Sequence, residues 1–126
     1  MKADRVATVS LLALLYGAQA WAGEADVLDV RAAPAPGGIY RFDVTVRHAD
    51  EGWDHYADAY DIVAPDGTVL GTRILAHPHV DEQPFTRSLG GVRIPPNVTT
   101  VAVRAHDMVH GLGGRTQHIQ LPERGK

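Results

Sequence analysis

Short runs of alternating apolar and polar residues, separated by turn signals, dominate the chain after residue 22. The clearest run is Tyr40–His48, in which aromatic residues and valine alternate with charged and polar residues. A period of two places one side of a strand in a core and the other side in water. No stretch after residue 22 has a convincing helical period, so the sequence predicts an all-β fold.

Six further strands are expected from the same pattern, at residues 27–31, 60–63, 69–75, 85–89, 101–105 and 117–121. Pro65-Asp66-Gly67 and Pro95-Pro96-Asn97 are typical of turns, and Gly90-Gly91 predicts a bulge. The alternation also predicts the members of the core: Phe42, Val44, Val46, Ile62, Val101 and Val103.

Seven short strands in about 100 residues favour an antiparallel sandwich of two sheets. The strand order of residues 23–126 resembles an immunoglobulin-like or fibronectin type III-like domain. The likeness is one of architecture, and sandwiches of this kind host unrelated functions.

The first 22 residues have the three parts of a secretory signal peptide. Lys2 and Arg5 precede an apolar run over residues 6–16, and Ala20-Trp21-Ala22 follows at the spacing that a signal peptidase reads, with Ala18-Gln19-Ala20 as a second choice. The run is too short for a spanning helix, which needs about 20 apolar residues. We therefore expect cleavage after Ala22, a periplasmic or secreted location, and a single mature domain over residues 23–126.

Composition excludes several classes of site and partner. The chain has no cysteine, which rules out disulfides, thiolate metal sites and cysteine nucleophiles. Its formal net charge of −3 argues against a nucleic-acid binder, which needs a basic surface. No basic amphipathic stretch predicts membrane insertion of the mature chain. No nucleophile, base and oxyanion-binding group assemble in the sequence, so we expect no enzymatic activity.

Three segments resemble the sequences of small exported bacterial proteins of uncharacterised function: residues 53–58, 64–73 and 77–87. This resemblance implies a bacterial cell envelope and supplies no activity.

Histidine is unevenly distributed along the chain. An up-and-down strand order brings the connections at 48–58, 76–84 and 105–115 to one end of the sandwich. Six of the seven histidines fall in these connections: His48, His55, His77, His79, His106 and His110. Imidazole is the commonest metal ligand in proteins, and Cu(II) and Zn(II) suit a site without cysteine.

The sequence thus predicts a metal site built on His77 and His79, whose rings point to one side of an extended segment. The other expected ligands are His55, His106 and His110. Acidic residues at the same end could ligate or hold imidazole N–H groups: Asp54, Asp58, Asp81, Glu82 and Asp107.

A second interpretation needs no metal. In it the histidines are structural or solvated, and the loops with Trp53 and Tyr56 hold an envelope protein or a glycan. His48 has the same parity as the core residues of its strand, which predicts a hydrogen-bonded side chain that caps the core.

Overall fold

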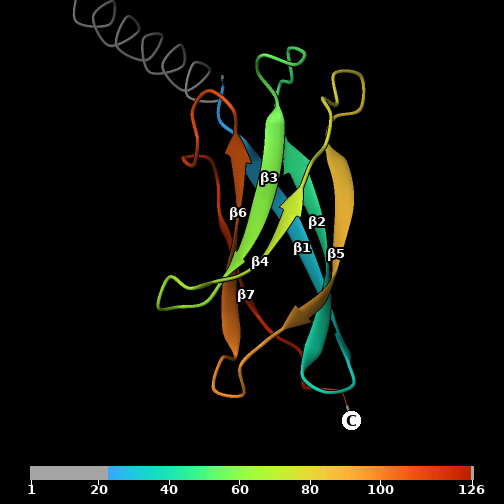
Figure 1. Cartoon of the computed structure of the whole chain (residues 1–126), viewed down its shortest axis with the longest axis vertical. Helices are drawn as coiled ribbons and strands as arrows, with labels where there is room; N and C mark the ends of the chain where they lie inside the picture. Colours follow the sequence, from blue (N-terminus) through green and yellow to red (C-terminus); the bar gives the residue numbers. More distant parts are fainter. Residues whose placement is uncertain (1–22, 126) are drawn as a thin grey trace, which may run out of the picture.

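A computed structural model describes residues 23–125 as two antiparallel β-sheets packed face to face (Figure 1). The predicted signal peptide lies outside the described residues. Within the described part of the chain, no helix could cross a membrane.

The two sheets contain the seven strands that the sequence predicts. One sheet has the order β1-β2-β5, formed by β1 (Asp26–Ala35), β2 (Ile39–Arg47) and β5 (Phe85–Arg93). The other has the order β4-β3-β6-β7, formed by β3 (Ala57–Val63), β4 (Val69–Ile74), β6 (Thr100–Asp107) and β7 (Gln117–Gln120). Every pairing between neighbouring strands is antiparallel, which confirms the two-sheet sandwich.

The core lies between the sheets and contains all six predicted residues. Phe42, Val44 and Val46 of β2 are fully buried, as are Ile62 of β3 and Val103 of β6, and Val101 is almost so. Two tyrosine hydroxyls at the edge of this core donate to backbone carbonyl oxygens, which satisfies polar atoms that would otherwise be buried unpaired.

The predicted bulge is present in β5. The register between β2 and β5 shifts between Tyr40 and Phe42, whose partners are Val92 and Leu89, so two residues of β5 lack a partner there. Gly91 has a φ of 67°, a conformation that glycine adopts at no steric cost. The first strand is longer than expected, because an edge strand tolerates the proline near its end, Pro34.

The connections β2–β3, β4–β5 and β6–β7 all lie at one end of the sandwich, as the strand order predicts (Figure 1). Gly23, where the described chain begins, lies at the same end, because its carbonyl oxygen contacts the rings of His48 and His55. Four segments that are distant in sequence therefore meet there.

Candidate metal centre

His48 follows β2 directly and is buried at the end of the core. Its Nδ1 lies 2.5 Å from Oδ1 of Asp50, to which it donates. Its Nε2 lies 2.9 Å from the carbonyl oxygen of Gly23 and 3.8 Å from Oδ2 of Asp107. The prediction that His48 caps the core with a hydrogen-bonded ring is confirmed. The Nε2 atom of His48 faces the loops at this end of the sandwich.

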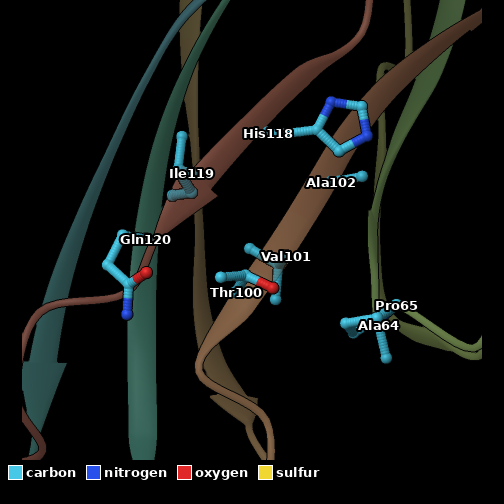
Figure 2. Close-up of a pocket in the computed structure, with 8 residues that line it drawn as sticks. All are labelled: Ala64, Pro65, Thr100, Val101, Ala102, His118, Ile119 and Gln120. Atoms are coloured by element: carbon cyan, nitrogen blue, oxygen red, sulfur yellow. The ribbon is translucent and has the colours of Figure 1, made fainter.

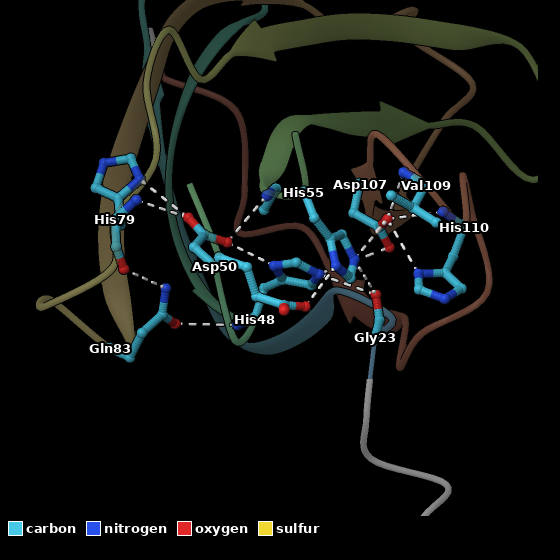
Figure 3. A network of polar contacts seen from close by, with 11 residues as sticks. Gly23, His48, Asp50, His55, His79, Gln83, Asp107, Val109 and His110 are labelled. Carbon is cyan, nitrogen blue, oxygen red and sulfur yellow. Dashed lines mark hydrogen bonds and ion pairs between the residues drawn. The ribbon is translucent and has the colours of Figure 1, made fainter. Parts of the chain in front are cut away.

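His55 repeats this arrangement from the β2–β3 connection (Figure 3). Its Nδ1 lies 2.8 Å from Glu51, and its Nε2 lies 3.2 Å from the Gly23 oxygen and 3.4 Å from Oδ1 of Asp107. The rings of His55 and His48 meet edge to face at 4.7 Å between centroids. Each imidazole thus has a carboxylate behind Nδ1 and directs Nε2 to a common point. Metal-binding histidines almost always have such an outer partner.

Asp107 ends β6 and is fully buried. Its Oδ1 accepts the backbone N–H groups of Val109 and His110, at 2.8 and 2.7 Å. Burial raises the pKa of Asp107, but the N–H groups of His110 and Val109 and the nearby His48 outweigh this effect and lower it. The carboxylate is therefore ionised. Its Oδ2 has no hydrogen-bond partner within residues 23–125, which is costly for a buried acceptor.

The two imidazoles face oxygen atoms at both ring nitrogens. Such acceptors are satisfied only if each ring carries two protons or if a cation replaces the protons on Nε2. Burial lowers the pKa of His55, but its bonds to Glu51 and Gly23 and the charge of Asp107 outweigh burial and raise it. The centre therefore attracts positive charge.

One ion could be shared by three of these side chains. His48, His55 and Asp107 each offer a ligand atom, and these atoms lie within 4.8 Å of one another. Zinc accepts imidazole and carboxylate ligands at about 2.0 to 2.2 Å, so a small contraction would close the group around an ion. His110 lies at the rim, with its ring centroid 5.0 Å from that of His55.

The structure brings together three of the residues that the sequence assigns to the site: His55, His110 and Asp107. The sequence did not predict four other groups as part of the metal site: His48, Asp50, Glu51 and the Gly23 carbonyl. The parity of His48 did signal its burial. No local pattern signals that the backbone of residue 23 lies beside it.

His77 and His79 lie together but apart from this group. Their ring centroids are 4.7 Å apart. His79 stacks on Phe85 at 4.0 Å, and Figure 3 shows it on the opposite side of Asp50 from His48. His77 is exposed, and its Nδ1 donates to the carbonyl of Pro78. Their role as metal ligands stays a prediction.

The other predicted residues lie elsewhere at the same end. His106 pairs with Asp58, and Glu82 accepts a hydrogen bond from Arg87 that lowers the pKa of Glu82. Asp54 and Asp81 are exposed. Trp53 is 66% exposed and packs edge to face on Tyr56.

The burial of the His79 ring predicts that the stability of the protein depends on pH. Its ring is buried, and neither nitrogen has a hydrogen-bond partner in the described part of the chain. Burial, with help from Arg87 and His77, lowers the pKa of His79. As the pH falls below about 6.5, His79 therefore binds a proton in the unfolded chain before it does so in the folded protein. The free energy of unfolding decreases as the pH decreases, until the pH reaches the lower pKa of His79 in the folded state.

We expect His79→Leu to lose less stability between pH 7 and pH 5 than the unsubstituted protein, as measured by urea unfolding. His118→Ala, which removes an exposed histidine, is the matched control and should retain the full loss. Equal losses in His79→Leu and the unsubstituted protein would contradict a neutral buried His79.

His118 does not join the loop-end group. It lies on β7 beside a pocket with seven uncharged lining residues, which Figure 2 shows: Ala64, Pro65, Thr100, Val101, Ala102, Ile119 and Gln120. A single imidazole without carboxylates is a poor metal site, so His118 serves as a control position.

Comparison with known proteins finds a relative. A protein of Halomicrobium mukohataei named "Putative lipoprotein" is 44% identical to this chain over 96 residues. The aligned region is 76% of this chain and 47% of the relative, so the chain spans about half the length of the curated relative that it matches. No family model matches the chain. No solved structure matches it either.

Proposed function

We propose that this protein is an exported, non-catalytic domain that binds one Zn(II) or Cu(II) ion through His48, His55 and Asp107. One observation carries the proposal: two imidazoles backed by carboxylates converge on the buried carboxylate of Asp107, one oxygen of which lacks a hydrogen-bond partner. Asp50 and Glu51 would orient the two rings, and His110 is placed to become a fourth ligand. Imidazole with carboxylate is a ligand set that both metals accept.

The other parts of the proposal have separate support. Export to the envelope is supported by the leader-like first 22 residues and by the name of the relative. A binding role is favoured over catalysis because Ser88 bonds Asp43 and Arg41 on the outer face of its sheet, with no imidazole against it. An immunoglobulin-like or fibronectin type III-like sandwich is supported by the strand order β1-β2-β5 and β4-β3-β6-β7.

Calorimetric titration of metal-stripped protein with Zn(II), and separately with Cu(II), tests the function. We expect one equivalent to bind with a single dominant affinity. His48→Ala and Asp107→Ala each remove a ligand and should weaken binding by at least the roughly 10- to 100-fold that loss of a ligand's outer partner costs. Binding should also weaken as pH falls, since imidazole must lose its Nε2 proton to bind the ion.

The control for this titration is His118→Ala, which should bind like the unsubstituted protein. Scattered surface histidines also bind copper weakly. If His48→Ala and His118→Ala have the same small effect, the proposed centre does not exist.

A second candidate function is partner binding at the same end, with the histidines serving structure alone. The observation that favours it is the exposure of large apolar side chains on these loops: Trp53, Val80, Met108, Val109 and Leu112. Such residues are typical of protein or glycan contacts. Trp53→Ala should then reduce cross-linking of the domain to envelope components.

A further inference from the structure

The backbone of Gly23 lies where the two imidazoles converge (Figure 3). Its carbonyl oxygen is 2.9 Å from Nε2 of His48 and 3.2 Å from Nε2 of His55. A Cβ at this position would lie 2.4 Å from Cε1 and 2.8 Å from Nε2 of His110. Glycine is therefore the residue that fits here without displacing a ring, and its main chain is part of the candidate centre.

The same residue follows the expected cleavage site, Ala20-Trp21-Ala22. A signal peptidase would hydrolyse the Ala22–Gly23 peptide bond with one water molecule. Ala22 would gain the new carboxylate, and Gly23 would keep its nitrogen as a free α-amine. An amide nitrogen is a poor ligand because its lone pair is delocalised into the carbonyl group. An α-amine has a pKa of about 8 and can lose its proton to a metal.

We propose that removal of the leader completes the metal centre, with the α-amine and carbonyl oxygen of Gly23 chelating the ion that His48 and His55 hold. This inference rests on the proposed metal-binding function and on cleavage after Ala22. Amine, imidazole and oxygen ligands together form the N,O set that suits Cu(II). The completed site therefore favours Cu(II) over Zn(II), and it forms only after export and processing.

Selective acetylation of the α-amine tests this inference. After cleavage the chain has a single lysine, Lys126, so Lys126→Arg leaves the Gly23 α-amine as its one primary amine. We would export this variant with its own leader, verify by N-terminal sequencing that it begins at Gly23, and acetylate half of the sample. Competition with a chromophoric chelator then gives the Cu(II) affinity of each half. We expect acetylation, which removes a ligand, to weaken binding by at least the roughly 10- to 100-fold that loss of a ligand's outer partner costs.

Electron paramagnetic resonance of the Cu(II) form identifies the ligand directly. Protein grown with nitrogen-15 glycine and otherwise normal nitrogen should show an altered superhyperfine pattern, because a glycine nitrogen is bound. The acetylated half of the same sample is the control and should show no difference between labelled and unlabelled protein.

The outcomes separate this inference from the function on which it rests. Unchanged affinity after acetylation, an unaltered spectrum with labelled glycine, or a mature chain that begins at Trp21 would overturn it. If His48→Ala still loses binding in those cases, the metal-binding function stands and the role of the amine fails. If the unmodified mature protein binds no Cu(II), both proposals fail.

Discussion

The melting temperature of the mature protein should rise by about 10 to 20 °C when free Cu(II) or Zn(II) exceeds the dissociation constant 100-fold. A ligand that binds only the folded state at this excess stabilises it by about 2.7 kcal/mol. In a domain of this size, each kcal/mol raises the melting temperature by about 4 to 8 °C. Differential scanning calorimetry with and without metal measures the shift.

Two variants identify the residues responsible. His48→Ala with His55→Ala should abolish the rise, because both rings direct Nε2 to the same point. His77→Ala should keep the rise if the ion lies at that point, since His77 is exposed and bonds its own loop. Loss of the rise in His77→Ala alone would instead favour the pair His77 and His79 that the sequence predicts. No rise in the unsubstituted protein would exclude both sites.

Asp50→Ala should lower the free energy of unfolding of the metal-free protein by about 3 to 5 kcal/mol, because each buried donor that loses its acceptor costs about 1 to 3 kcal/mol. Its carboxylate is buried and accepts hydrogen bonds from the His48 ring and from the backbone N–H groups of Ala57 and His79, the last at 2.6 Å. Without the side chain, two buried N–H groups have no acceptor, and the connections at this end lose their common anchor. Urea unfolding, followed by circular dichroism, measures the loss.

Asp54→Ala is the matched control, because Asp54 lies in the same loop and is exposed. Its effect should stay within about 0.5 kcal/mol, as for surface substitutions in general. Asp50→Asn should fall between the two, since an amide keeps one acceptor oxygen but loses the charge. If Asp50→Ala unfolds at the same urea concentration as Asp54→Ala, the carboxylate does not hold the loops together.

Some of the site could be predicted from the sequence because an up-and-down sandwich has only two ends. Once the strands are identified, the histidine-bearing connections have to share one of those ends. His55, His110 and Asp107 meet there for this reason. The ring orientations could not be predicted, because each depends on a partner from another segment.

His48 and His79 illustrate this limit. Both are buried histidines at the same end, and Asp50 contacts both of their segments. His48 has Asp50 on one ring nitrogen and the Gly23 carbonyl on the other, whereas the ring of His79 stacks on Phe85. Packing against residues far along the chain therefore decides which histidine could bind an ion.

The sequence by itself determined the seven strands, the buried faces, the bulge at Gly90-Gly91 and the end at which histidine collects. These features follow from local periodicity and turn chemistry, which act over a few residues. The tertiary structure alone decided that residue 23 meets His48 and His55, that Asp107 keeps an unpaired buried oxygen, and that His79 is enclosed. Those contacts join segments more than 20 residues apart, and their geometry is set by how the sheets and loops pack rather than by any local pattern.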